Sequence, residues 1–225
     1  MKTYLLVTEK IWHHELFEDL LISKSGNWII INQKENFTLN KIESLKPDYI
    51  FIPHWSHIIP SEIFLRYECI LFHMTDLPFG RGGSPLQNLI VLDYKETVIS
   101  AIRVEKGLDT GPIYLKSKLS LLGTAEEIFI RSGLIIKDMI FSIIENNISP
   151  QLQSGNISNF RRRKRSESNI SSLSDINKVY DYIRMLDAEG YPNAFLETES
   201  LLFEFSRASL KANKTIIADV RIIKK

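Results

Sequence analysis

Short apolar runs alternate with longer stretches of mixed polarity in the first half of the chain. Because these runs lack the alternation of a half-exposed strand, they predict strands buried on both faces of a sheet, at residues 4–8, 28–31, 49–53 and 69–72. Apolar residues at helical spacing predict helices at residues 14–21, 39–45 and 60–65. Repeated strand and helix units imply an α/β, Rossmann-like fold with a doubly wound, mainly parallel sheet. In such a sheet the functional site lies at the carboxyl ends of the strands.

The second half of the chain predicts further helices and strands. We expect a Gly-initiated helix at residues 82–92 and two strands at 97–104 and 111–121. Another helix is expected at 174–185, and a group of short strands at 195–223. Thr124 and Glu127 form a capping-box pattern at the start of a long amphipathic helix that continues to Asn146. Ser174 is the expected N-cap of the later helix.

These elements divide the chain into a main domain, a linker and an appendage. The main domain is expected to cover residues 1–150, and a stretch rich in Ser, Asn, Arg and Lys predicts a linker at 151–172. Residues 173–225 are expected to form a small C-terminal α+β appendage of one helix and strands. Because this segment is too short to bury much core alone, we expect it to dock on the main domain.

Charge and cysteine content narrow the partners and the compartment. The 28 Lys and Arg residues nearly balance 27 Asp and Glu residues, so no general attraction for nucleic acid is predicted. The cationic run at residues 161–165 is either a solvated loop or a segment that holds a diphosphate. The single cysteine, Cys69, cannot form an internal disulfide, and the chain start lacks signal-peptide character, which predicts a cytoplasmic location. No segment reaches the roughly 18 apolar residues of a membrane span.

No phosphate-binding glycine motif follows the predicted strands. Because neither G-x-G-x-x-G nor a P-loop occurs, we expect neither a dinucleotide nor an NTP held through its phosphates in the usual manner. The histidines at positions 13, 14, 54 and 57 lack convergent cysteine or carboxylate partners, so no metal site is predicted. Trp55 is either a core residue or a surface on which a pterin ring stacks. The residues suited to chemistry are concentrated instead at 73–87 and 105–113.

These two segments resemble the formyltransferase family, which includes methionyl-tRNA formyltransferase, glycinamide ribonucleotide formyltransferase and nucleotide-sugar N-formyltransferases. The family pattern is matched in order by His73, Thr75, Leu77, Pro78, Arg81, Gly82, Pro85, Gln87, Gly107, Asp109, Gly111 and Ile113. A second resemblance, over residues 161–195, covers the linker and a Tyr-Pro-Asn-Ala-Phe segment at 191–195. This segment is similar to the Pro-Gly-Ala-Phe segment beyond the family's catalytic domain. The likeness spans most of the chain and is weakest before residue 45 and after residue 196.

The resemblance implies an enzyme that moves a formyl group from 10-formyltetrahydrofolate to an amine. His73 and Asp109 are the implied catalytic residues. The residues expected to bind the folate are Leu77, Pro78, Ile102, Val104, Leu108 and Asp109. The residues expected to bind the acceptor are Thr75, Arg81, Gly82, Gly83, Ser84, Gln87, Arg161, Arg162, Arg163, Arg184 and Tyr191.

The physical chemistry of formyl transfer favours the same centre. The reaction needs proton transfer between the incoming and departing nitrogens and a donor for the developing oxyanion. A histidine at the carboxyl end of a strand suits proton transfer near neutral pH. Asp109 lies in a Gly-flanked turn, from which it can orient the imidazole or a water. The turn at residues 81–84 enters a helix, where it can accept an anion or allow close backbone approach.

One position departs from the family pattern. The family's catalytic asparagine, two residues before the histidine, is Leu71 in this chain, and leucine cannot donate to an oxyanion. Either a backbone amide, a water, or one of Asn88, His54 and His57 replaces it, or catalysis rests mainly on the histidine and the aspartate. The loss of one oxyanion donor costs about 10² to 10³ in rate, so the change predicts a slower enzyme.

Three acceptors are compatible with the motif. A tRNA acceptor predicts a sizeable RNA-binding appendage and a basic surface, which the short tail and balanced charge do not favour. A glycinamide ribonucleotide acceptor would not require the Arg-rich linker. A nucleotide-linked amino sugar of the 4-amino-4,6-dideoxy type, with UDP as the favoured nucleotide, fits the tail and the cationic run and is therefore predicted. A non-catalytic binding protein is the alternative that Leu71 motivates.

The sugar acceptor carries further expectations about biology and assembly. It places the enzyme in polysaccharide biosynthesis, in a pathway of the pseudaminic-acid type. It also predicts no nucleic-acid partner and no membrane partner. Related sugar formyltransferases are often dimers, so a homodimer is one expected state.

Overall fold

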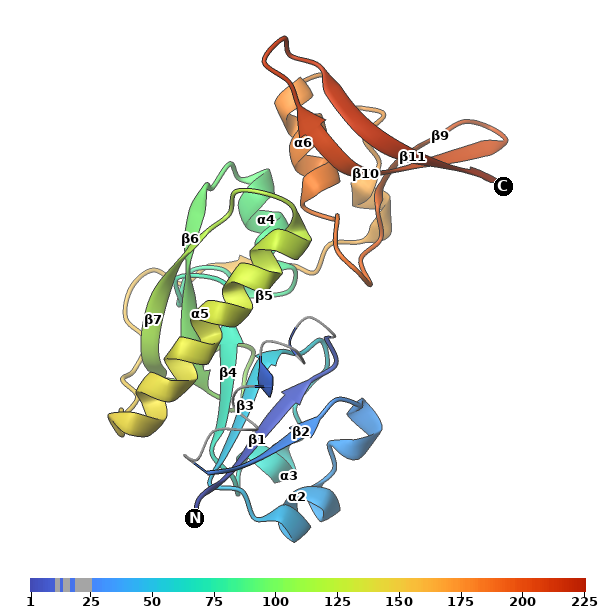
Figure 1. The fold of residues 1–225 in the computed structure, drawn as a ribbon. Coiled ribbons are helices and arrows are strands. Elements are labelled where there is room, and N and C mark those ends of the chain that lie inside the picture. Colours follow the sequence, from blue (N-terminus) through green and yellow to red (C-terminus); the bar gives the residue numbers. More distant parts are fainter. Residues whose placement is uncertain (11–12, 14–16, 19–25) are drawn as a thin grey trace. The chain divides into compact units, whose positions relative to one another are not determined.

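The structure, a computed structural model, describes residues 1–10, 13, 17–18 and 26–225 (Figure 1). The helix expected at residues 14–21 lies largely outside the described residues. Within the part that is described, no helix is both long enough and apolar enough to cross a membrane.

A mainly parallel sheet forms the centre of the fold, as the apolar runs predict. Its six strands are β1 (Thr3–Thr8), β2 (Asn27–Ile31), β3 (Tyr49–His54), β4 (Cys69–His73), β6 (Glu96–Arg103) and β7 (Ile113–Ser120). They lie in the order β2-β1-β3-β4-β6-β7. The β1–β2, β1–β3 and β3–β4 pairs are parallel, whereas β6 runs antiparallel to β4. The predicted α/β architecture is confirmed.

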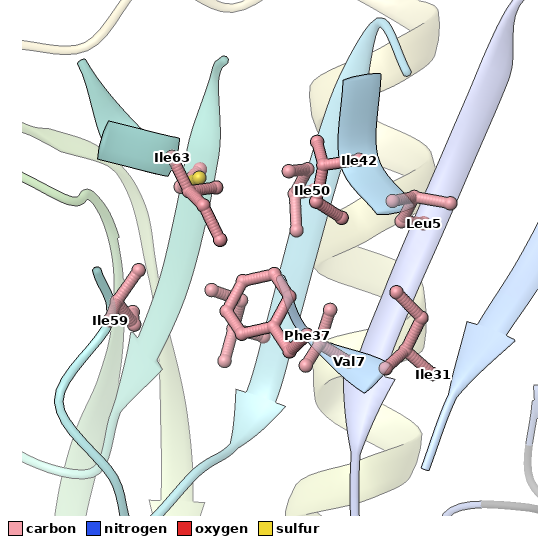
Figure 2. Close-up of a cluster of buried hydrophobic side chains, with 10 residues drawn as sticks. Leu5, Val7, Ile31, Phe37, Ile42, Ile50, Ile59 and Ile63 are labelled. Atoms are coloured by element: carbon pink, nitrogen blue, oxygen red, sulfur yellow. The ribbon is translucent and has the colours of Figure 1, made fainter. Parts of the chain in front are cut away.

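Helices cover both faces of this sheet. On one face lie η1 (Lys34–Asn36), α2 (Leu39–Leu45) and α3 (Ser61–Phe64). Figure 2 shows Ile42 of α2 and Ile63 of α3 beside side chains from the strands, while α5 (Ala125–Glu145) crosses behind the sheet. The buried cluster on the first face contains Leu5, Val7, Ile31, Phe37, Ile42, Ile50, Ile52, Ile59, Ile63 and Cys69. Burial of this apolar surface drives the assembly of the unit, at roughly 25 cal/mol for each Å² removed from water.

The helix caps show where local sequence signals were sufficient. The capping box at α5 is confirmed, because the Thr124 N–H donates to Glu127 Oε2 at 2.8 Å and the Glu127 N–H donates to Thr124 Oγ1 at 3.3 Å. At α6 (Ile176–Arg184) the expected cap, Ser174, is wrong by one residue. Asp175 is the N-cap, and its side chain accepts from the Asn177 N–H at 2.9 Å.

The chain forms two compact units, each assembled from several segments. Unit 1 comprises Met1–Gly82, Val98–Leu119 and Ile130–Asn159, and unit 2 comprises Gly83–Thr97, Ser120–Phe129 and Phe160–Lys225. Two segments from the first 150 residues thus group with the C-terminal residues. The division into a main domain, linker and appendage at residues 150 and 172 stays a prediction.

Unit 2 is built around helix α6 and a small sheet. It contains α4 (Pro85–Val91), η2 (Arg165–Ser168), α6 and three antiparallel strands in the order β11-β10-β9. These strands are β9 (Ala194–Glu197), β10 (Leu201–Leu210) and β11 (Ile216–Lys224), and α6 packs against both α4 and β10. The short strands β5 (Arg81–Gly82) and β8 (Asn159–Phe160) lie where the chain passes between the units.

Candidate active site

His73 is the last residue of β4, so it lies at the carboxyl end of a parallel strand. Its side chain is 7% exposed, and its ring Nε2 lies 2.9 Å from the Gly80 carbonyl oxygen. A carbonyl oxygen only accepts hydrogen bonds, so Nε2 carries the proton and donates. The Thr75 hydroxyl donates to the same oxygen at 3.3 Å. Gly80 thereby sets both the orientation and the tautomer of the imidazole.

Asp109 faces the other ring nitrogen from the turn between β6 and β7. Its Oδ2 lies 3.5 Å from His73 Nδ1 and accepts the Gly82 backbone N–H at 2.8 Å. The carboxylate is as deeply buried as the imidazole, at 7% exposure. Asp109 has a φ of 53°, in the left-handed region that a residue with a side chain adopts only at a cost. The surrounding structure must therefore hold this turn in place.

The same turn approaches β6 so closely that a side chain is excluded. A Cβ built on Gly111 would lie 1.8 Å from the Arg103 carbonyl oxygen, far inside contact distance. The Arg103 N–H donates to the Pro112 carbonyl at 2.9 Å on the same side. Glycine at position 111 thus permits the approach that carries Asp109 to the histidine.

The imidazole and the carboxylate are placed to share a proton. Because Nε2 already donates to Gly80, an unprotonated Nδ1 would direct its lone pair at Asp109 Oδ2. A proton on either partner removes this repulsion. The pair can therefore give a proton to a departing nitrogen, or take one from an attacking amine, without a change in the ring's orientation.

The loop that follows His73 is tied to the neighbouring strands. The Ser100 hydroxyl donates to the Thr75 carbonyl at 2.8 Å and accepts the Leu77 N–H at 3.3 Å. The Lys116 ammonium donates to the Leu77 carbonyl at 2.7 Å and also pairs with the Asp76 carboxylate. These contacts hold the segment between His73 and Gly80 against β6 and β7.

The residues expected to bind folate differ in how accessible they are. Leu77, Pro78 and Ile102 are buried, whereas Val104 is partly buried and Leu108 is 60% exposed. An exposed leucine beside the Asp109 carboxylate fits a ligand with a flat apolar ring. Among the described residues, Trp55 contributes an indole N–H that is buried without a hydrogen-bond partner. Trp55 directly follows the carboxyl end of β3 and packs on the core cluster, so it suits the core better than a stacking surface.

Within unit 1, the residues expected to bind the acceptor lie between His73 and Gly82. Thr75 is buried and bonded to Gly80, and the Gly82 N–H is bonded to Asp109. The Arg81 guanidinium donates to Gln153 Oε1, with distances of 3.2 Å from Nε and 2.7 Å from Nη2. Arg81 is partly buried, and its guanidinium has further N–H donors beyond those bonded to Gln153; its contact with the acceptor stays a prediction.

In unit 2, the cationic run is attached to the start of α4. The Arg163 N–H donates to Ser84 Oγ at 3.1 Å, and a Cβ on Gly83 would meet the Arg162 Cβ at 2.7 Å. Arg161 forms two hydrogen bonds of 2.7 Å to the Glu167 carboxylate. The hydrogen bonds from Arg161 and from the Lys164 backbone lower the pKa of Glu167 to about 2. The run is thus an ordered loop with part of its charge neutralised within the chain.

Three other residues expected to bind the acceptor have structural roles in unit 2. Arg184 is 3% exposed and donates to Asp181 Oδ1 at 2.6 Å and to two carbonyl oxygens, those of Leu121 and Gly123. Gln87 is buried and donates to the Met185 carbonyl at 3.0 Å. The Tyr191 ring stacks on Phe129, and burial raises its pKa to about 12. Arg184, Gln87 and Tyr191 thus have partners within unit 2, and their contacts with the acceptor stay predictions.

The structure also bears on what replaces the family's asparagine. The Leu71 side chain packs against the core cluster. The Asn88 amide donates to the Gly83 and Arg161 carbonyls, and His57 pairs with Glu9 at 2.9 Å. Burial lowers the pKa of His54 to about 3, so this ring is neutral at physiological pH. Since Asn88 and His57 already have partners, a backbone amide or a water is the simpler replacement.

Gln153 contributes to the site but carries no sequence signal. Its amide nitrogen donates to the Asp109 and Gly111 carbonyls, each at 2.8 Å, while its oxygen accepts from Arg81. It lies in a polar loop without hydrophobic periodicity, outside the motif segments. No side-chain cluster that could hold a metal occurs among the residues for which the structure gives a placement.

Comparison with known proteins defines the class. Residues 21–128 match the formyl transferase family model, and residues 165–223 match the C-terminal domain model of methionyl-tRNA formyltransferase. A solved methionyl-tRNA formyltransferase from Clostridium thermocellum is 50% identical, with a TM-score of 0.96 and complete coverage of both chains. The chain belongs to the formyltransferase family.

More distant relatives set limits on this comparison. A methionyl-tRNA formyltransferase from Thermodesulfovibrio yellowstonii is 26% identical over 67% of this chain and 52% of its own length. This chain thus spans about half the length of the curated relatives that it matches. A sugar N-formyltransferase from a Shewanella species covers 97% of this chain and 96% of its own, with a TM-score of 0.65. At 16% identity, it shares the fold alone.

The predicted sugar acceptor and the predicted absence of a nucleic-acid partner are wrong. The structure at 50% identity and the matching C-terminal model both belong to methionyl-tRNA formyltransferases. The predicted role in polysaccharide biosynthesis depended on the nucleotide-sugar acceptor, and these relatives do not support it. Net charge is a sum over the whole chain and tail length describes no surface, whereas an acceptor is recognised by a local surface.

Proposed function

We propose that this chain transfers a formyl group from 10-formyltetrahydrofolate to the α-amino group of methionine carried on tRNA. The buried His73–Asp109 pair, with the tautomer of its imidazole set by Gly80, is the observation that carries the proposal. Membership of the formyltransferase family supports the donor. The 50% identical methionyl-tRNA formyltransferase supports the acceptor.

The bound donor supplies an electrophilic formyl carbon, and this chain's residues manage protons around it. The His73–Asp109 pair takes the proton that the attacking amine must lose and returns a proton to the nitrogen that departs. Because both side chains are largely buried, water competes little with these transfers. The Gly82 N–H and the Gly80 carbonyl keep the two groups aligned during the exchange.

Leu71 bears on the rate of the proposed reaction. Without the family's asparagine, a backbone amide or a water must stabilise the oxyanion, and such a change costs about 10² to 10³ in rate. A non-catalytic binding protein would show the folate and acceptor affinities without turnover. Turnover therefore separates the enzyme from the binding protein.

The direct test incubates the whole chain with 10-formyltetrahydrofolate and methionyl-tRNA. Formation of tetrahydrofolate is followed by absorbance, and formylmethionyl-tRNA is identified by mass spectrometry after hydrolysis of the ester. Uncharged tRNA, free methionine and a UDP-linked amino sugar serve as alternative acceptors, and His73→Ala serves as the inactive control. Formylation of methionyl-tRNA above the other acceptors supports the proposal. No formylation of methionyl-tRNA under saturating conditions would refute it.

A further inference from the structure

Residues 151–158, which we call the strap, bond to two parts of the candidate active site within unit 1. One is the loop that orients His73, and the other is the segment around Asp109. At one end, the backbone of Gln151 exchanges two hydrogen bonds with Ile113, at 2.7 and 2.8 Å. At the other end, the Ser158 hydroxyl accepts the Gly80 N–H at 2.8 Å and its carbonyl accepts the Arg81 N–H at 3.0 Å. The strap therefore bonds both to the start of β7 and to the loop that orients His73.

Gln153 is the residue of the strap that reaches the turn carrying the carboxylate. Its Nε2 donates to the carbonyls of Asp109 and Gly111, and its Oε1 accepts from the Arg81 guanidinium. An amide side chain carries two N–H donors and an acceptor oxygen on one short planar group. A carboxylate could keep the Arg81 contact, but it could not donate to the two carbonyls.

Asp109 needs such a restraint because of its backbone conformation. Its φ of 53° lies in a region that is unfavourable for a residue with a Cβ, so the turn relaxes unless neighbouring groups hold it. The Gln153 amide bonds to the Asp109 carbonyl itself, and relaxation of that peptide would rotate the side chain away from His73. Displacement of a catalytic group by about 1 Å can cost 10²-fold in rate.

We infer that Gln153 is a positioning residue, which holds the Asp109 turn so that the carboxylate stays in register with His73. The inference rests on the proposed function for its kinetic consequences. It differs from a general structural role, because only the alignment of the pair should suffer when the two amide hydrogen bonds are lost. The hydrophobic core of unit 1 packs on the sheet and does not include this side chain.

The test compares Gln153→Glu with Gln151→Glu. Gln151 is exposed and contributes backbone hydrogen bonds, so its substitution makes the same chemical change two residues away. For Gln153→Glu we expect kcat to fall about 10- to 100-fold, with KM for both substrates within about threefold of wild type. Gln151→Glu should retain wild-type kcat. Gln153→Met removes both the amide donor and the acceptor oxygen without adding charge, and it should reproduce the kcat loss.

A second readout does not depend on turnover. The ring ¹H–¹⁵N resonances of His73, assigned by their loss in His73→Asn, should change in Gln153→Glu and in Gln153→Met but not in Gln151→Glu. Should the wild-type chain lack activity, the proposed function fails while the resonances still decide the role of Gln153. Unchanged His73 resonances in both Gln153 variants would overturn the inference. So would wild-type kcat in a folded Gln153 variant, or a loss confined to KM.

Discussion

Asp109→Asn isolates the charge and proton of the carboxylate, since asparagine keeps nearly the same shape. The amide oxygen can still accept the Gly82 N–H, which Asp109 Oδ2 accepts at 2.8 Å. The turn can therefore persist. The same oxygen faces both the Gly82 N–H and His73 Nδ1, so the substitution leaves an oxygen there but removes the negative charge 3.5 Å from Nδ1 and a site for the shared proton.

The size of the effect follows from that distance. For unit charges at 3.5 Å and an effective dielectric constant of about 20, the attraction between imidazolium and carboxylate is about 5 kcal/mol. Both side chains are 7% exposed or less, so solvent screening is weak. If half of this attraction is lost in the transition state, kcat falls by about 10²-fold, at 1.36 kcal/mol for each factor of ten. This is the lower part of the range for a positioned acid–base group, roughly 10² to 10⁴.

The assay measures kcat and KM for 10-formyltetrahydrofolate and methionyl-tRNA in the wild type and in two variants. Asp93→Asn is the matched control, because Asp93 also has a positive φ, of 66°, but has a 62% exposed side chain paired to Lys178 in unit 2. Asp93→Asn should stay within about threefold of wild type, as expected for an exposed ion pair. If Asp109→Asn also stays within a few-fold of wild type, the carboxylate only shapes its turn and the assignment is wrong.

Three further predictions test the site and its surroundings. His73→Asn should abolish folate-dependent formylation with the circular dichroism spectrum preserved; undiminished kcat would remove the imidazole from the mechanism. Gly111→Ala should lower the free energy of unfolding by about 1 to 3 kcal/mol or more, because the added Cβ would collide with the Arg103 carbonyl; a denaturant titration that matches wild type would contradict this packing. Glu167 has a pKa lowered to about 2 by its hydrogen bond from Arg161, so it stabilises the fold above the usual pKa of 4.5 and loses that contribution as pH falls towards 2. Glu167→Gln should therefore lose less stability than wild type between about pH 5 and pH 3 in urea unfolding, and identical slopes would refute the ion-pair argument.

The sequence alone determined the strands, the mainly parallel sheet and the two catalytic candidates. Strands such as β1 and β3 were predictable because apolar runs buried on both faces are a local property of the chain. The α5 capping box was predictable for the same reason, since Thr124 and Glu127 are three residues apart and bond each other directly. His73 and Asp109 followed from the family motif, which preserves the order of residues around them.

Tertiary structure decided the partners of those residues, because such contacts join positions that are far apart in the chain. Gln153 bonds to the Asp109 carbonyl although the two residues are 44 positions apart in the chain. No periodicity or motif predicts a contact between residues so far apart. Arg184 likewise donates to the Leu121 and Gly123 carbonyls, which lie 63 and 61 positions away in the chain. The tautomer of His73 likewise depends on the path of the loop that brings the Gly80 carbonyl to Nε2. The chemical type of a side chain determines which bonds it can form, but only the fold determines which group lies next to it.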